Sequence, residues 1–169
     1  ELLKMKLNAA LPADIAVTSL EIADERFVAS LAAKSCTYTC RIATDPAIAL
    51  FSRPYTCVVT ESLDLEAMRQ AAQLLTGTHD FAAFSNGRTK KSTVRTVETI
   101  KINREGQLIQ IQLTANSFLR HMPQLLAGSI LTAGKEKKTD GTTLTLAGVE
   151  SAAPACPSHA FTLTDVQLR

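Results

Sequence analysis

The residues of this sequence that could bind a metal ion or form disulfides are its four cysteines and three histidines: Cys36, Cys40, Cys57, Cys156, His79, His121 and His159. Zinc sites are typically built from closely paired ligands such as CxxC, which does not occur here, and the histidines lie far apart. Cys36 and Cys40 lie in a Thr/Ile-rich segment that predicts a strand, where four residues span about 13 Å. That separation is too large for two ligands of one zinc ion. We therefore expect no metal, and we interpret the cysteines as structural thiols of a reducing cytoplasm.

Other chemical motifs are sparse. The sequence has no P-loop, GxGxxG, HExxH, GxSxG or EF-hand loop. The string Gly87-Arg88-Thr89-Lys90 is a turn before a basic pair, which by itself predicts a solvated loop. His121, next to Arg120 near an expected helix start, could face an anion or cap the helix, and we favour the cap. Tyr38 lies in the middle of an expected strand, where a half-buried sheet aromatic is the simplest interpretation.

Charge is distributed unevenly along the chain. Residues 1–80 carry 7 basic and 10 acidic side chains, whereas residues 81–169 carry 11 and 6. The densest basic segment runs from Arg88 to Glu105, and its only acidic residues are Glu98 and Glu105. Its basic residues are Arg88, Lys90, Lys91, Arg95, Lys101 and Arg104. A basic loop that runs into a strand can contact phosphates, although lysines on a loop are more often simply solvated, so this feature leaves both interpretations open.

Alternating apolar and polar residues predict the strands that must position these side chains. The clearest case is 108–114, which an Asn103–Gly106 turn joins to a strand over 94–103, with Gly106 taking the positive φ of a hairpin. Further strands are expected at Ala16–Ile22, Thr37–Ala43, Tyr55–Thr60 and Phe161–Leu168.

Helical periodicity is strongest between Leu63 and Gly77. Asp64 is placed to cap the helix, Leu63 can pack on Met68, and Gly77 can end it. Further helices are expected over residues 2–11, stopped by Pro12, from Ser117 to Gly134, and from Thr142 to Val149.

These elements predict one α+β fold, with a mainly antiparallel sheet and helices packed on one face. The chain has 169 residues, 46% of them hydrophobic, and a formal net charge of +2, which is enough for one domain with a core. Segments 85–92 and 151–157 are expected to be loops rather than domain boundaries. No apolar run reaches the length of a membrane span, and no secretory signal is recognisable. The missing initiator Met suggests a trimmed sequence.

Six local strings follow one another over nearly the whole chain: LNAALPADIAV, RFVASLAAKSCTYTCRI, LDLEAMRQAAQLLTGTHDFAAFS, VRTVETIKI, ANSFLRHMPQLLAGSILTAGK and CPSHAFTLTDVQL. Together they resemble the TruA-type tRNA pseudouridine synthases in order and spacing. The resemblance implies a pseudouridine synthase-like fold, with residues 1–12 as the end of the N-terminal half and residues 13–169 as the C-terminal domain.

The resemblance also implies an activity and its partners. The family isomerises uridine to pseudouridine in the anticodon arm of tRNA, as a homodimer, without metal or organic cofactor. Its nucleophile is an Asp in a G-R-T-D motif upstream of the LNxxLP segment, so we expect no catalytic residue in this chain and no turnover by the chain alone. The Gly87-Arg88-Thr89-Lys90 string is not that motif, because it follows HDFAAFS and ends in Lys.

Two substrate-binding residues carry over by position. Tyr38 matches the family tyrosine that stacks on the target base, an interaction worth about 1–3 kcal/mol. Gln124 stands where the family has an Arg that pairs with the catalytic Asp, and a neutral amide can hydrogen-bond a carboxylate but cannot lower its pKa as a guanidinium does. The expected RNA contacts are Lys34, Arg88, Lys90, Lys91, Arg95, Arg120 and His121.

The chain departs from the family pattern in several places. Val28 and Ser30 replace His and Arg, and Cys36, Thr39 and Cys40 replace Arg, Arg and Tyr. Pro123 replaces an aliphatic residue and removes a backbone donor, which predicts a delayed or kinked helix.

Three hypotheses follow. The chain is the C-terminal half of a divergent tRNA pseudouridine synthase, a noncatalytic RNA-binding member of the same fold, or a globular domain with no RNA function. A G-R-T-D segment encoded upstream of Glu1 would favour the enzyme, whereas a start codon near Glu1 would favour the inactive module.

Overall fold

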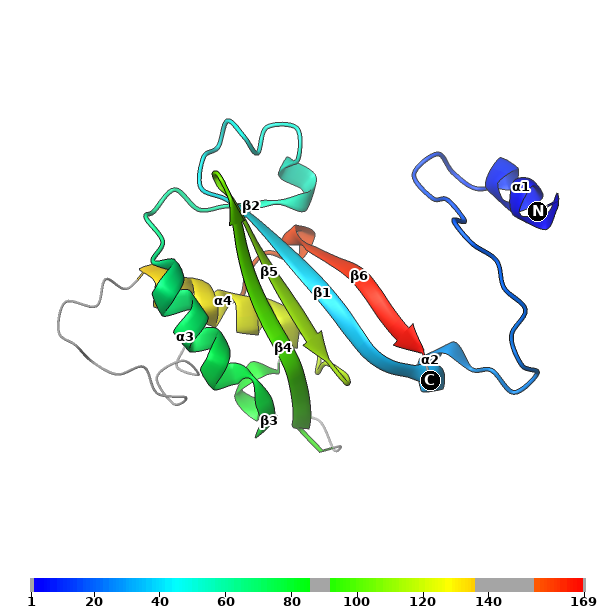
Figure 1. Ribbon diagram of the computed structural model, residues 1–169. Coiled ribbons are helices and arrows are strands. Elements are labelled where there is room, and N and C mark those ends of the chain that lie inside the picture. The colour runs from blue at the N-terminus through cyan, green and yellow to red at the C-terminus, as the bar shows by residue number, and fades with distance from the viewer. Residues whose placement is uncertain (1, 86–91, 136–153, 169) are drawn as a thin grey trace. The chain divides into compact units, whose positions relative to one another are not determined.

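The computed structural model of the protein describes residues 2–85, 92–135 and 154–168. The chain divides into two compact units, Glu1–Ala32 and Ala33–Arg169. Figure 1 shows the elements of both units. The expected helix at Thr142–Val149 and most of the expected loops lie outside the described residues.

The first unit contains two helices, α1 (Leu2–Ala10) and α2 (Ala29–Ala32). The predicted helix before Pro12 is confirmed, although none of its residues is buried. The strand expected at Ala16–Ile22 is wrong, because this segment has no strand conformation and pairs with none of the described strands. The Asn8 side chain holds this segment, since its Oδ1 accepts from Val17 N at 2.6 Å and its Nδ2 donates to Val17 O at 3.1 Å.

The second unit is built on a six-stranded sheet in the order β2-β1-β5-β4-β3, with β6 also paired to β1. Its strands are β1 (Ala33–Ala43), β2 (Cys57–Val58), β3 (Gly77–Asp80), β4 (Val94–Glu105), β5 (Leu108–Ala115) and β6 (Phe161–Leu168). Its helices are α3 (Leu65–Leu75) and α4 (Met122–Lys135), with 3₁₀ turns η1 (Arg53–Tyr55), η2 (Ala82–Phe84) and η3 (Ser158–Ala160).

The sheet is mixed, which corrects the expectation of a mainly antiparallel one. Strand β2 runs parallel to β1, with Ile42 opposite Cys57, while the other pairings are antiparallel. A long connection through η1 separates β1 from β2, and such a connection allows the chain to return in the same direction. The strand expected at 55–60 shrinks to two residues because Pro54 and its neighbours form η1 instead.

The hairpin of β4 and β5 is confirmed, and Gly106 has φ 60° at its turn. Along β5 every second residue is buried, beginning with Ile109, so one face of the sheet is apolar. Strand β3 was not expected, because its four residues show no apolar alternation. Pairing with β4 defines it, with His79 opposite Arg95.

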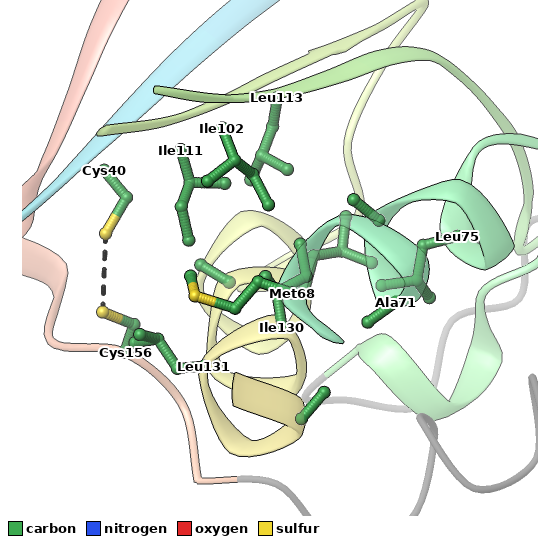
Figure 2. Packing of buried hydrophobic residues seen from close by; sticks show 14 of the residues in the cluster. Cys40, Met68, Ala71, Leu75, Ile102, Ile111, Leu113, Ile130, Leu131 and Cys156 are labelled. Atoms are coloured by element: carbon green, nitrogen blue, oxygen red, sulfur yellow. Dashed lines mark hydrogen bonds between the residues drawn. The ribbon is translucent and has the colours of Figure 1, made fainter. Parts of the chain in front are cut away.

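Helices α3 and α4 pack against each other and against the buried face of the central strands (Figures 1 and 2). The predicted cap is confirmed, since Asp64 Oδ1 accepts from the backbone N–H groups of Glu66 and Ala67. Met68 of α3 and Ile130 of α4 are fully buried against the strand residues. The core therefore lies between this helix pair and the sheet. Among the described residues, none of the helices has the length and apolar character that crossing a membrane requires.

Candidate functional site

A cavity of about 280 Å³ lies at the N-terminal end of α4. Its lining comes from β1, from the segment before α4, from the first turn of α4 and from the start of β6, and consists of Tyr38, Phe118, Leu119, Arg120, His121, Pro123, Gln124 and Phe161. We call it the Tyr38 pocket. Four residues singled out from the sequence thus meet in one place, and their functional roles stay predictions.

Tyr38 forms one wall of this pocket from the middle of β1. It is paired with Leu113 of β5, whose side chain is fully buried, so the Tyr38 ring lies on the helix-covered side of the sheet. The ring is half-buried, and Phe118 meets it edge to face, with 5.4 Å between ring centroids and an interplanar angle of 84°. Such a contact favours one orientation of both rings and stabilises it by about 0.5–1.5 kcal/mol.

The turn before α4 places two side chains at the pocket rim. Met122 N donates to Leu119 O at 3.1 Å, and His121 has a φ of 62°, which is uncommon for a residue other than glycine. Arg120 and His121 are both exposed, with Arg120 Nε 3.4 Å from His121 Nε2. The rim of the pocket therefore carries a cation.

The helix begins at Met122 rather than near Ser117, so the predicted delay of its start is confirmed. Pro123 occupies the first helical turn, where its missing N–H removes no intrahelical hydrogen bond. Residues 117–121 are consequently free to form the turn at the rim.

Gln124 contributes a neutral amide to the pocket from the first turn of α4. Its Oε1 is buried and has no hydrogen-bond partner among the described residues. A buried acceptor without a partner costs about 1–3 kcal/mol, which a ligand with an N–H or O–H group could recover. The backbone carbonyl of Gln124 accepts from Cys156 N at 3.0 Å and ties α4 to the segment before β6.

The remaining predicted RNA contacts lie elsewhere. Lys34 is exposed near the start of β1 and does not line the Tyr38 pocket. Arg95 does not line the pocket either. Its Nη1 donates to Ser92 O at 2.9 Å and to Val94 O at 2.7 Å. The other three, Arg88, Lys90 and Lys91, lie outside the described residues.

Sequence reasoning missed the apolar half of the pocket. Phe118, Leu119, Pro123 and Phe161 line it but were not singled out as site residues. A signal was present, because Phe118 directly precedes the Leu-Arg-His string and Phe161 opens an expected strand. Only the pairing of Phe161 with Cys40 brings it close to Tyr38.

Three of the four cysteines meet in the core, which was not expected from their spacing. Cys40 Sγ and Cys156 Sγ are 3.5 Å apart (Figure 2), and Cys57 is hydrogen-bonded to Cys156. The hydrogen bond from Cys156 and burial raise the pKa of the Cys57 thiol far above its usual range, and the hydrogen bond to Cys40 and burial raise the pKa of Cys156. Within residues 2–85, 92–135 and 154–168, no group of three His, Cys, Asp or Glu residues is arranged to hold a metal ion.

We expect Cys40 and Cys156 to resist thiol reagents in the folded protein at pH 8, because both are buried and because the thiolate, which is the reactive form, is suppressed at Cys156. Cys36, half-buried and outside this cluster, is the internal control. Iodoacetamide labelling read by peptide mass spectrometry tests this, and rapid labelling of Cys156 before unfolding would contradict it.

The raised pKa values of Cys57 and Cys156 also predict how stability depends on pH. Because these thiols ionise at lower pH in the unfolded chain than in the folded protein, the free energy of unfolding should fall as the pH rises above about 8.5. Below that pH the two thiols should not affect it.

The profile of one protein family, described as tRNA pseudouridine synthase, matches residues 71–166. The match begins within α3 and ends within β6, so it includes Phe118, Gln124 and Phe161, while Tyr38 precedes it. Both this match and the mixed sheet with its helix layer are consistent with a pseudouridine synthase fold. The chain belongs to the tRNA pseudouridine synthase family.

Curated relatives narrow this to the TruA type. The chain is 37% identical over 132 residues to tRNA pseudouridine synthase A 2 of Bacillus cereus, covering 78% of this chain and 54% of the relative. It is 38% identical over 126 residues to tRNA pseudouridine synthase A 1 of Clostridium tetani, covering 74% and 51%. The tRNA pseudouridine synthase A of Halalkalibacterium halodurans is 37% identical over 134 residues, covering 79% and 51%. The chain thus spans about half the length of the curated relatives it matches.

Proposed function

We propose that this chain is the C-terminal, base-binding half of an enzyme that isomerises uridine to pseudouridine in the anticodon arm of tRNA. One observation carries the proposal. Tyr38, which the resemblance assigns to stacking on the target base, lines the same cavity as Gln124, which comes from a different element.

The chemistry of the Tyr38 pocket fits a nucleotide. The aromatic ring of Tyr38 offers a face for stacking on a base, an interaction that depends little on which base is bound. The Gln124 amide can exchange hydrogen bonds with the edge of a base, and its buried Oε1 lacks a partner among the described residues. Arg120 at the rim supplies a cation for a phosphate group. An unstacked nucleotide presents these three features together.

The proposal places the nucleophile outside this chain. Gln124 lacks charge and so cannot hold a carboxylate in its ionised form as a guanidinium does. The attacking Asp is proposed to come from the part of the full-length protein that precedes this chain, so the chain by itself should not turn over.

A noncatalytic RNA-binding module is the second candidate. The neutral Gln124 favours it, as does the replacement of the family cations at Cys36 and Thr39. Both candidates predict tRNA binding, so only a measurement of turnover separates them.

Tritium release from tRNA that contains C5-tritiated uridine is that measurement. We expect release with the full-length protein and none with the 169-residue chain. Binding of tRNA without release by the full-length protein, under conditions in which a related synthase works, would establish the noncatalytic module instead. If neither binding nor release occurs, both candidates are wrong.

The RNA contacts are tested separately by measuring tRNA affinity against salt concentration. A contact through the predicted cations requires log affinity to fall steadily with log salt; these are Lys34, Arg88, Lys90, Lys91, Arg95, Arg120 and His121. The homodimer implied by the resemblance and the cytoplasmic location inferred from the cysteines stay predictions.

A further inference from the structure

The fold fixes the backbone from which Gln124 reaches the Tyr38 pocket. The residue is half-buried and lines the pocket from the first turn of α4. Its backbone carbonyl accepts from Cys156 N at 3.0 Å. One position further along the helix, Leu125 N donates to His121 O at 3.1 Å. The side chain can therefore turn, but the direction from which its amide enters the pocket is set.

The Oε1 atom of Gln124 is a buried acceptor without a hydrogen-bond partner in the described parts of the chain. Leaving an acceptor in this state costs free energy, so the amide gains by turning toward a donor that enters the pocket. The neighbouring Arg120 is exposed, and its Nε lies 3.4 Å from His121 Nε2. Much of the remaining lining is apolar and consists of Phe118, Leu119, Pro123 and Phe161.

A uracil base carries the group that this acceptor lacks. Its N3–H is a donor that lies between two carbonyl acceptors, while a glutamine amide holds one acceptor and one donor in a plane. Oε1 can accept from N3–H while Nε2 donates to a neighbouring carbonyl, which gives two parallel hydrogen bonds. A base that stacks on Tyr38 turns its edge toward the other walls of the pocket, and enzymes that act on unstacked bases commonly read this edge.

The N3–H edge of the base is unchanged by the isomerisation. The N1–C1′ bond breaks with its electron pair left on the uracil ring, a C5–C1′ bond forms, C5 loses its proton and N1 gains one. N1 and C5 must therefore exchange places relative to the ribose. A half-turn of the ring about the line through N3 and C6 exchanges them, and it also exchanges the two carbonyls. N3–H keeps its place and is again flanked by two carbonyls.

We propose that Gln124 is a specificity-determining residue, whose amide pairs with the N3–H edge of the target uracil in both the uridine and the pseudouridine orientation. The inference rests on the proposed function in taking the Tyr38 pocket as the base-binding site. A neutral amide suits this role because it offers an acceptor, which the guanidinium of an Arg at this position would lack. The replacement of the family Arg by Gln124 thus gives the pocket a direct contact with the base.

Methylation of the base at N3 tests the proposal, because it removes the donor and keeps the ring and both carbonyls. Uridine 5′-monophosphate (UMP), its 3-methyl derivative and pseudouridine 5′-monophosphate are titrated into the full-length protein and followed by NMR. We expect UMP to bind at least about tenfold more tightly than the 3-methyl nucleotide, since a site with an unpaired acceptor rejects a ligand without the donor. The pseudouridine nucleotide should bind within about twofold of UMP, because it presents the same edge.

Two variants separate the hydrogen bond from the bulk of the methyl group. Gln124→Met keeps the length of the side chain without its amide, and Gln124→Ala removes both. Each variant should bind UMP and its 3-methyl derivative with affinities equal within about twofold, because no acceptor for N3–H is left. Gln73→Met is the matched control, since Gln73 is exposed on α3 and does not line the Tyr38 pocket. It should keep the preference of the wild type.

The outcomes separate this inference from the proposed function. Equal affinity of the wild type for UMP and its 3-methyl derivative would overturn the inference without any variant. A preference that persists in Gln124→Met would also overturn it, since the bulk of the methyl group would then be the cause. So would the absence of UMP binding by a protein that releases tritium. In these three cases the proposed function stands if tritium release depends on Tyr38. If the full-length protein neither binds UMP nor releases tritium, the proposed function is wrong and this inference with it.

Discussion

Replacing Tyr38 with alanine in the full-length protein should lower kcat/KM for tritium release from tRNA by about 10- to 100-fold. The physical reason is the loss of stacking between the tyrosine ring and the target base, worth about 1–3 kcal/mol. The substitution also removes the edge contact that orients Phe118, 5.4 Å away between ring centroids. A second wall of the Tyr38 pocket is therefore disturbed together with the first.

Two controls sharpen this prediction. Tyr38→Phe keeps the ring and its contact with Phe118, so it should retain most of the activity if stacking is the role of the residue. Tyr55→Ala removes the other tyrosine of the chain, which is 60% exposed and lies outside the pocket, and it should leave the rate unchanged. Full activity of Tyr38→Ala would show that the site is assigned wrongly, and equal losses in Tyr38→Phe and Tyr38→Ala would place the role on the hydroxyl group.

Much of the second unit could be predicted because its signals are local. The alternation in β5, the Gly106 turn and the Asp64 cap each need only a few neighbouring residues, and all three are confirmed. The meeting of Tyr38 with Gln124 has a different origin. They are far apart in sequence, and only the resemblance to a family indicated that both belong to one site.

The features that could not be predicted depend on pairing between distant segments. The four residues of β3 are a strand because β4 lies beside them, whereas Ala16–Ile22 has strand-like alternation but no partner strand among the described residues. The parallel direction of β2 follows from the path of its connection rather than from its residues. The apolar half of the pocket depends likewise on Phe161 lying next to Tyr38 through the pairing of β6 with β1.

Gly128→Ala in α4 should destabilise the protein, and by more than Gly134→Ala on the same helix. A Cβ at this position would lie 2.0 Å from Pro154 O and 3.1 Å from Pro154 C, which are both backbone atoms. The segment carrying Pro154 must therefore move, and overpacking of this kind costs about 1–3 kcal/mol. Alanine gains only about 1 kcal/mol over glycine in helix propensity, so we expect a net loss of stability in a denaturant titration.

Gly134→Ala is the matched control on the same helix. There the new Cβ would lie 2.5 Å from Met68 Cγ and 3.0 Å from Met68 Sδ, which belong to a flexible side chain. We expect a smaller loss of stability than for Gly128→Ala. The Met68 side chain can relieve the clash by changing rotamer, whereas the Pro154 carbonyl can do so only if the backbone moves. An unfolding free energy for Gly128→Ala equal to or above that of the wild type would contradict this argument.

The reactivity of the Cys156 thiol distinguishes whether the added methyl group displaces the segment that carries Pro154 and Cys156 or displaces α4. Its segment is held by the hydrogen bond from Cys156 N to Gln124 O at 3.0 Å and by the contact with Cys40 at 3.5 Å. If the added methyl group pushes this segment away from α4, both contacts weaken and Cys156 becomes more accessible. Iodoacetamide should then label Cys156 faster in folded Gly128→Ala than in wild type or Gly134→Ala. Destabilisation without faster labelling would mean that α4 moves instead, and with it the Gln124 wall of the Tyr38 pocket.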